Sequence, residues 1–336
     1  MIQQRGDSDS TIRMNDGYDR SGKASILVVG SANMDMVVSC DRFPLPGETV
    51  LANGFDTFPG GKGANQAVAA AKLGGRVHFL GKLGSDSFRL SLLESLKREG
   101  VHLGGVMTDE HASTGVALIT VAEGGENQIV VASGSNMRLS VSDLEKHEAL
   151  FRDASVVLIQ LEIPLETAMR AAELGRAHGA VVILNPAPAM ELPDAFLANL
   201  DFITPNETEV DQLAGLTPDG VPTTAASARM LVQRGAKNVI VTLGEQGALW
   251  VSEKGVEHFE AFEVEVADTT AGGDAFNGAL AYALAKGMPL SEAICLSNAV
   301  GAFAVMRHGA QPSMPDRQAI EEFIDQREAH ATQNAR

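Results

Sequence analysis

Short runs of branched apolar residues alternate with helix-type patterns along most of the chain, and this alternation constrains the fold more than any other feature. Strand-type runs are expected at 25–30, 76–83, 154–160, 180–184, 201–204 and 237–242. Helices are expected between them, at 64–73, 87–99, 165–178, 207–213 and 224–234. Strands separated by helices predict βαβ units. The expected fold class is therefore α/β: a central, mostly parallel sheet flanked by helices in a Rossmann-type three-layer arrangement.

Two regions interrupt this alternation. The stretches at about 34–58 and about 106–133 contain extended segments and turns with no helix between them. This pattern predicts a small β-sheet that projects from the main one. The first 24 residues are polar and mixed in charge, and we expect them to form a disordered extension. The expected organisation is thus a tail at 1–24 and a single domain at 25–330.

Composition excludes several classes of function. The chain has 336 residues, of which 45% are hydrophobic, and a formal net charge of −17. An acidic balance argues against binding to nucleic acid or to an anionic membrane, since phosphate backbones select basic patches. Cys40 and Cys295 match no metal or redox spacing, which favours the reducing cytoplasm. No run of 18 apolar residues predicts a membrane span.

The segment Asp-Thr-Thr-Ala-Gly-Gly-Asp at 268–274 precedes an Ala/Leu-rich run with good helix propensity. Ala271, Gly272 and Gly273 let backbone N–H groups approach a ligand closely, at the positive end of the helix dipole. This arrangement suits a phosphate. Asp274, at the same point, has two interpretations: a helix N-cap, or a base that takes a proton from the group attacking the phosphate.

Other polar residues follow expected strands, where ligands of open parallel sheets bind. Asn33 and Asp35 are two residues apart and point the same way in an extended segment, which suits vicinal hydroxyls. Gly-Gly-Lys-Gly-Ala-Asn at 60–65 is neither a Walker A loop nor a dinucleotide fingerprint, and it opens a helix. Glu162 ends a strand. Each of these has an ordinary structural alternative, namely a turn or a surface acid.

Two further motifs are also ambiguous. In Asn-Glu-Thr-Glu at 206–209, Asn206 and Glu209 have the spacing of a capping box, and also suit a water-mediated Mg²⁺ site. Thr-Leu-Gly-Glu-Gln-Gly at 242–247 predicts a strand-to-turn transition that either contacts a nucleotide or forms a hairpin.

Together, the ordered motifs NxD, GGKGAN, QLE, NPAP, NETE, TLGEQG, DTTAGGD and HGAQPS resemble the ribokinase branch of the ribokinase-like carbohydrate kinases, from about Ser25 to Phe323. The resemblance implies an ATP-dependent kinase that makes ribose 5-phosphate, with Mg²⁺ required and K⁺ stimulating. It implies a sugar bound beneath a β-lid, and a homodimer formed through that lid.

The resemblance also assigns residues. It implies that Asp274 is the base and that the backbone of Ala271, Gly272 and Gly273 is the anion hole. Sugar contacts are implied for Asn33, Asp35, Gly61, Lys62, Asn65, Glu162 and Asp274. Nucleotide contacts are implied for Asn206, Thr242, Gly244, Glu245, Gly273 and Asn298, and Mg²⁺ binding for Asn206 and Glu209. The implied K⁺ positions are Asp268, Thr270, Ala304, Arg307, Gly309 and Ser313.

Alternatives stay open at the level of sequence. A 2-deoxyribokinase, or a nucleoside or fructose kinase, would differ from a ribokinase by a few pocket hydrogen bonds. A non-catalytic sugar-binding regulator could share the fold, because fold does not fix function. A dehydrogenase is disfavoured by the absent dinucleotide fingerprint.

Overall fold

The computed structural model describes residues 25–215 and 223–334, so the expected disorder of residues 1–24 lies outside the described residues. A large nine-stranded sheet forms the body, in the order β13-β12-β11-β10-β9-β8-β1-β4-β5. Neighbouring strands from β11 to β5 run parallel, and β12 and β13 add an antiparallel edge. The strands are β1 Ser25–Val29, β4 Arg76–Gly84, β5 His102–Asp109, β8 Val156–Gln160, β9 Val181–Asn185, β10 Phe202–Ile203, β11 Asn238–Thr242, β12 Ala248–Ser252 and β13 Gly255–Phe259.

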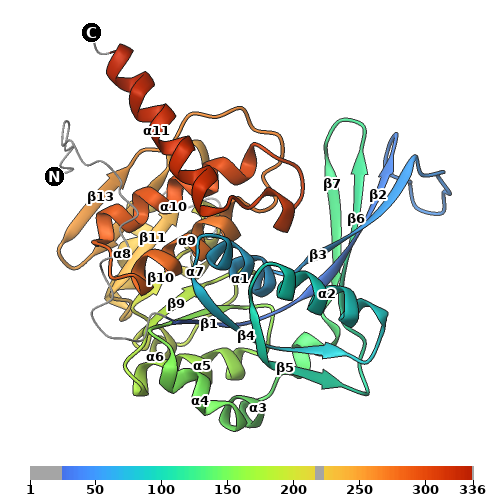
Figure 1. Ribbon diagram of the computed structural model, residues 1–336, viewed down its shortest axis with the longest axis horizontal. Coiled ribbons are helices and arrows are strands. Elements are labelled where there is room, and N and C mark those ends of the chain that lie inside the picture. Colours follow the sequence, from blue (N-terminus) through green and yellow to red (C-terminus); the bar gives the residue numbers. More distant parts are fainter. Residues whose placement is uncertain (1–24, 216–222, 335–336) are drawn as a thin grey trace.

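Helices cover both faces of this sheet, as Figure 1 shows. On one face lie α1 Lys62–Lys72, α2 Ser87–Arg98, α9 Gly272–Ala285, α10 Leu290–Val305 and α11 Arg317–Asn334. On the other lie α3 Val141–Lys146, α4 Glu148–Asp153, α5 Leu165–Ala177, α6 Asp194–Leu197, α7 Glu207–Leu213 and α8 Thr224–Gln233. The three-layer α/β prediction is confirmed. In the described part of the chain, no helix is both long and apolar enough to cross a bilayer.

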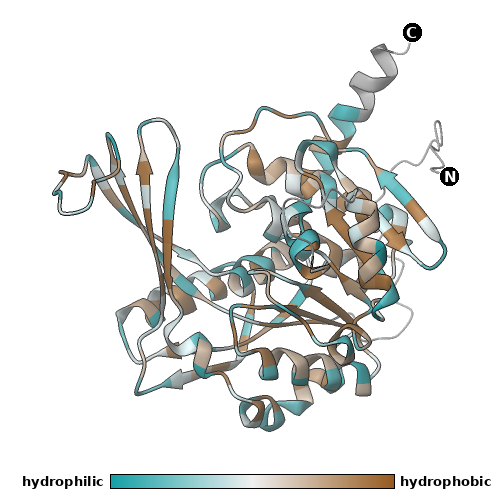
Figure 2. Ribbon diagram, turned by 180° about the vertical axis from the view of Figure 1, so that it is seen from behind, coloured by the Kyte–Doolittle hydropathy of each residue, from teal (hydrophilic) through white to brown (hydrophobic). Residues whose placement is uncertain are grey.

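The strands are apolar throughout because each of their faces is covered. In β1, Ile26 and Val28 pack into the core under α1 and α9, whereas Leu27 and Val29 pack into the core under α5. Successive side chains of a strand point to opposite faces, so a doubly covered strand has no polar face. Figure 2 shows the result as hydrophobic strands through the centre of the body.

A smaller four-stranded sheet, in the order β3-β2-β6-β7, projects from the body (Figure 1). Its strands are β2 Asn33–Cys40, β3 Gly54–Gly60, β6 Gly115–Ala122 and β7 Asn127–Ala132. The second region that we expected in this sheet, 106–133, was given a first residue too early in the chain. Residues 102–109 instead form β5, which pairs in parallel with β4 at the edge of the large sheet.

Helix α9 is buried between α1 and α10, and it touches α1 very closely at Gly278. A Cβ atom on Gly278 would lie 2.5 Å from Ala69 Cβ and 2.7 Å from the Gln66 carbonyl oxygen. The contact explains why the run from Ala64 to Ala70 is rich in alanine, since larger side chains would separate the helices. Both helices begin at the same edge of the sheet, so this contact also positions their N-terminal side chains.

We expect Gly278→Ala to lower the free energy of unfolding by about 1–3 kcal/mol, because the added methyl group overpacks the contact between α1 and α9. Urea unfolding would measure the change. Gly104→Ala is the matched control, since its Cβ would have no atom of residues 25–215 or 223–334 within 4 Å. Equal stability of the two variants would contradict this account of the contact.

Candidate active site

The polar residues singled out in the sequence gather at the carboxyl-terminal edge of the parallel strands. Glu162 follows β8, Asn206 follows β10 and Thr242 ends β11. Helices α1 and α9 begin at the same edge, where the first N–H groups of α1 donate to Glu162 and Ser31. The edge therefore combines carboxylates, amides and two positive helix ends.

The start of α9 contradicts one of the two interpretations of Asp274. The helix begins at Gly272 with Ala271 as its N-cap, and no side chain in the described part of the chain caps it. Asp274 is therefore inside the first turn, and the N-cap interpretation is wrong. Small residues ahead of Asp274 can adopt helical backbone, which allows the helix to begin earlier than the Ala/Leu-rich run. The N–H group of Gly272 donates to the Thr269 carbonyl at 3.3 Å, whereas those of Gly273 and Asp274 have no partner among the described residues.

The carboxylate of Asp274 is buried, with 6% of its residue surface exposed. Its Oδ2 accepts a hydrogen bond from Asn65 Nδ2 at 3.0 Å, and its Oδ1 accepts one from Gln66 Nε2 at 2.9 Å. Both donors are neutral amides on the first turns of α1. Asn277, one turn further along α9, donates to the Gly273 carbonyl at 2.8 Å and stiffens the loop end of the helix.

Asp274 lines a small polar cavity of about 200 Å³. Its lining includes Lys62, Asn206, Glu209, Thr270 and Gly273. A larger cavity of about 690 Å³ adjoins it, and the two share Asn206, Thr242, Thr269 and Gly273. The arrangement is that of a spacious site joined to a narrow polar one at the N-terminus of α9.

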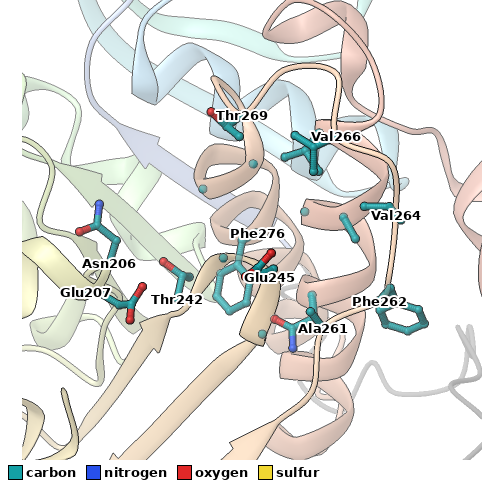
Figure 3. Close-up of a pocket in the computed structure, with 18 of the residues that line it drawn as sticks. Asn206, Glu207, Thr242, Glu245, Ala261, Phe262, Val264, Val266, Thr269 and Phe276 are labelled. Carbon is teal, nitrogen blue, oxygen red and sulfur yellow. The ribbon is translucent and has the colours of Figure 1, made fainter. Parts of the chain in front are cut away.

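The larger cavity lies between β11 and the segment that follows β13. Figure 3 shows Asn206, Glu207 and Thr242 on one side and Val264 and Val266 on the other. The expected nucleotide positions Gly244, Glu245, Gly273 and Asn298 also line it. The wall at 261–266 was missed, because an irregular segment has no periodic signal in the sequence, and Phe276 on α9 was not singled out.

Asn298 has a structural role that its position in the sequence did not show. Its Nδ2 donates to the carbonyls of Phe259 and Glu260, at 3.3 and 3.1 Å. These two bonds tie α10 to the start of the irregular wall of the larger cavity. The side chain thus holds the wall in place.

Asn206 and Glu209 form the expected capping box. Asn206 Oδ1 accepts from the Glu209 N–H group at 2.8 Å, and Glu209 Oε2 accepts from the Asn206 N–H group at 2.9 Å. Glu209 also lines the small cavity, where burial raises the pKa of its carboxyl group. A carboxylate whose charge is poorly compensated is suited to a cation.

Carboxylates crowd the region beside β2. Glu162 accepts hydrogen bonds from Ser31 Oγ and from the Lys62 N–H group, the latter at 3.2 Å. Asp35 lies against Gly60, and burial, with the charges of Glu162 and Asp274, raises the pKa of Asp35 to about 7. Burial lowers the pKa of Lys62, but the charges of Asp274, Glu162 and Glu209 outweigh it, and the pKa of Lys62 is raised. The site therefore contains several acids around one buried ammonium group.

Asn33 and Gly61 join β2 to the start of α1. Asn33 Oδ1 accepts from Asn136 Nδ2 at 2.7 Å, so Asn136, 103 positions further along the chain, orients this side chain. Gly61 has a φ of +88°, and a Cβ there would lie 2.6 Å from the Asn33 backbone nitrogen. Only glycine fits this close approach of the two segments.

The six expected K⁺ positions lie on two segments that Asp268 holds together. Its carboxylate accepts hydrogen bonds from the Thr270 N–H group at 2.9 Å and from the Gly309 N–H group at 3.0 Å. The Ala304 carbonyl accepts the Arg307 N–H group at 3.2 Å, and Ser313 Oγ donates to the Ala310 carbonyl at 2.8 Å. Among the described residues, no three His, Cys, Asp or Glu side chains group as metal ligands. K⁺ binding stays a prediction.

Comparisons with known proteins agree with this geometry. Residues 23–317 match the pfkB family carbohydrate kinases. The chain is 40% identical over 304 residues to a ribokinase of Haemophilus influenzae, covering 90% of this chain and 99% of the relative. It is 38% identical over 300 residues to a deoxyribokinase of Salmonella typhi, covering 89% of this chain and 98% of the relative.

A solved structure of Arabidopsis thaliana ribokinase complexed with ribose and ATP is similar in fold. It has 33% sequence identity and a TM-score of 0.82, covering 89% of this chain and 98% of that one. The chain belongs to the pfkB family of carbohydrate kinases, as the resemblance of its motifs predicted.

We expect Asp35→Asn to stabilise the unliganded protein at pH 8, by up to about 4 kcal/mol. The pKa of Asp35 rises from 3.8 to about 7 on folding, so the folded state holds the proton longer. Its carboxylate therefore reduces stability progressively as pH rises from about 4 to 7, and a neutral amide removes that cost.

Thermal or urea unfolding at pH 4 and pH 8 would test this sign, since the gain should vanish at the lower pH. Asp56→Asn, on the exposed part of β3 in the same sheet, is the control and should change little at either pH. A destabilised Asp35→Asn at pH 8 would show that the carboxylate has a favourable partner instead.

Proposed function

We propose that this carbohydrate kinase transfers the γ-phosphoryl group of ATP to the primary hydroxyl of D-ribose, giving D-ribose 5-phosphate. The observation that carries the proposal is the position of Asp274. Its buried carboxylate lines the small polar cavity, next to the N–H groups at the start of α9 and beside the larger cavity. An acid and an anion site side by side suit a reaction in which a hydroxyl loses its proton while it attacks a phosphate.

In the proposed reaction ATP occupies the larger cavity and its γ-phosphate lies at the N-terminus of α9. Asp274 takes the proton of the sugar hydroxyl as that oxygen bonds to phosphorus and the bond to the β-phosphate oxygen breaks. The backbone of Ala271, Gly272 and Gly273 stabilises charge on the phosphoryl oxygens. Phosphoryl transfer depends mainly on positioning and electrostatics, and this arrangement provides both.

The sugar occupies the space between the small sheet and α1. Asp35 and Asn33 lie on one face of β2. There, Asp35 accepts hydrogen bonds from vicinal hydroxyls of the sugar, and the Asn33 amide donates to one. Gly61, Lys62, Asn65 and Glu162 complete the contacts. A carboxylate placed for vicinal hydroxyls favours ribose over 2-deoxyribose, because the site would leave a polar group unpaired with the deoxy sugar.

Different groups of the protein would bind the two proposed cations, Mg²⁺ and K⁺. Glu209 uses only Oε2 in the capping box, so Oε1 remains for Mg²⁺ through water, together with Asn206. Mg²⁺ would neutralise charge on the phosphates of ATP. For K⁺, Asp268 and the carbonyls around 304–309 provide oxygen groups beside the loop that precedes α9. K⁺ would hold that loop in its active shape.

The substrate and the cations can be tested in one assay. Release of ADP from MgATP is measured with ribose, 2-deoxyribose, fructose or adenosine, each with K⁺ or with Na⁺. We expect the highest kcat/KM on ribose, and a higher rate with K⁺. Preference for 2-deoxyribose would replace the substrate and keep the mechanism, and binding of ribose without turnover would favour a sugar-binding regulator.

Asp274→Asn should fold normally and lose turnover by about 10²–10⁴-fold, the usual contribution of a placed base. Asp194→Asn removes an exposed carboxylate from the start of α6 and should leave kcat unchanged. Near wild-type turnover in a folded Asp274→Asn protein would end the assignment of this base.

We also propose a homodimer through the small sheet, in the cytoplasm. On the face opposite Asp35, that sheet exposes Phe55 by 56%, Leu118 by 50% and Val130 by 66%. Apolar side chains gathered on one face suit a second copy of the chain. Cys40 and Cys295 are free thiols, consistent with a reducing compartment.

Val130→Asp should convert the dimer to a monomer in sedimentation velocity, because it buries a charge at the proposed interface. Leu90→Asp, which changes an exposed leucine on α2, is the control and should leave the mass unchanged. A wild-type protein that sediments as a monomer would contradict the proposal directly.

A further inference from the structure

A chain of hydrogen bonds leads to the carboxylate of Asp274 through residues far apart in the sequence. Arg98 donates to Ser95 Oγ at 3.2 Å, and Ser95 Oγ donates to Gln311 Oε1 at 3.1 Å. Gln311 Nε2 then donates to Asn65 Oδ1 at 3.3 Å, and Asn65 Nδ2 donates to Asp274 Oδ2 at 3.0 Å. Every donor in this chain points toward the carboxylate.

The direction of this chain follows from its two ends. Arginine can only donate and an ionised carboxylate can only accept, so the hydroxyl and the two amides between them have one consistent orientation. Ser95, Gln311 and Asn65 are all buried, with 3%, 4% and 6% of their surfaces exposed. Water therefore has little access to replace a missing partner.

A second chain reaches the other carboxylate oxygen. Gln160 Nε2 donates to Gln66 Oε1, and Gln66 Nε2 donates to Asp274 Oδ1 at 2.9 Å and to Asn185 Oδ1 at 3.0 Å. Gln66 has three partners and is fully enclosed. Its orientation is thus well determined. The Asn65 amide has two contacts among the described residues, its own bond to Asp274 and the one that its Oδ1 accepts from Gln311.

We propose that Gln311 is a positioning residue for the base of the reaction, because its amide holds the Asn65 amide with the NH₂ group toward Asp274. The inference rests on the proposed function, in which Asp274 accepts the proton of the sugar hydroxyl. Gln311 lines neither of the two cavities, and its contact with the site is the bond to Asn65. It acts through Asn65.

Loss of this contact has a definite consequence. Without a donor at Oδ1, the buried oxygen of Asn65 has no partner, and the amide shifts to find one. Its bond to Asp274 Oδ2 then weakens, so the carboxylate turns away from the hydroxyl or takes up a proton. Either change lowers the rate of proton removal, and the second moves the acidic limb of the profile of kcat against pH to higher pH.

The test compares Gln311→Met with Gln311→Glu on the sugar that the wild type phosphorylates. The methionine variant keeps the volume and removes the donor, and we expect kcat to fall about ten- to a hundredfold. The glutamate variant keeps the acceptor for Ser95 but presents a second acceptor to Asn65, so its loss should be larger. Gln318→Met, an exposed glutamine on α11 bound to Glu322, is the control.

A double-mutant cycle with Asn65→Ala separates positioning from general stability. If Gln311 acts through Asn65, then Gln311→Met should change kcat less than twofold in the Asn65→Ala background. An equal loss in both backgrounds, or a Gln311→Met enzyme with the wild-type kcat and pH profile, would overturn the proposal. If Gln311→Met does not fold, Ser95→Ala weakens the same chain of hydrogen bonds from further away. It should move the acidic limb of the profile of kcat against pH in the same direction. An unchanged profile would then count against the proposal.

One readout does not depend on turnover. The side-chain NH₂ signal of Asn65 in a ¹⁵N spectrum, identified by its loss in Asn65→Ala, should move in both Asp274→Asn and Gln311→Met. An unmoved signal in Gln311→Met contradicts the inference even if no sugar is phosphorylated. A wild type inactive on ribose contradicts the proposed function alone.

Discussion

The close contact between α1 and α9 at Gly278 is the constraint on which the rest of the site depends. It leaves no room for a Cβ atom between the helices, since Ala69 and the Gln66 carbonyl would lie within 2.7 Å of it. Because both helices begin at the same edge of the sheet, the contact brings the amides of Asn65 and Gln66 to the carboxylate of Asp274. A buried helix pair thus fixes the geometry of groups that are more than 200 positions apart in the chain, at separations of 209 and 208. Stability and chemistry depend here on the same packing.

Several carboxylates lie close together at the site, and among the described residues the ammonium group of Lys62 compensates only part of their negative charge. Asp274, Glu162 and Glu209 act on Lys62, and the pKa values of Asp35 and Glu209 are raised, chiefly by burial. A chain with a net charge of −17 adds nothing to attract a nucleotide over distance. Local dipoles at the starts of α1 and α9 therefore carry the attraction to phosphate, together with the ammonium group and the cations of the proposal. The burial that raises the pKa of Asp35 also lowers the free energy of unfolding at neutral pH. In return, a hydrogen-bond acceptor is kept where a sugar would bind.

Sequence patterns predicted the layers well because the signal is local. The run from Ser25 to Val29 is apolar on both faces, and only a doubly covered strand needs that. Local signals also gave the capping box of Asn206 and Glu209. They failed where partners are remote: Gln311 meets Asn65 across 246 positions, and nothing near Gln311 in the sequence indicates an amide partner. The start of α9 was also wrong, because three small residues predicted a loop although two of them, Gly272 and Gly273, belong to the helix. The wall at 261–266 has no regular period, so its position depends on Asn298.

The nature of the donors to Asp274 bears on what this carboxylate can do. Among the described residues, both of its direct hydrogen bonds come from neutral amides. A guanidinium partner would orient the carboxylate too, but a charge-assisted pair holds the ionised form more strongly and makes it a poorer proton acceptor. Amides orient the group without placing a positive charge beside it. They also need partners of their own, since an unsupported amide can turn over and present its oxygen instead. A base oriented by amides therefore depends on residues further away, such as Gln311 and Gln160, and this dependence extends the site well beyond the cavity walls.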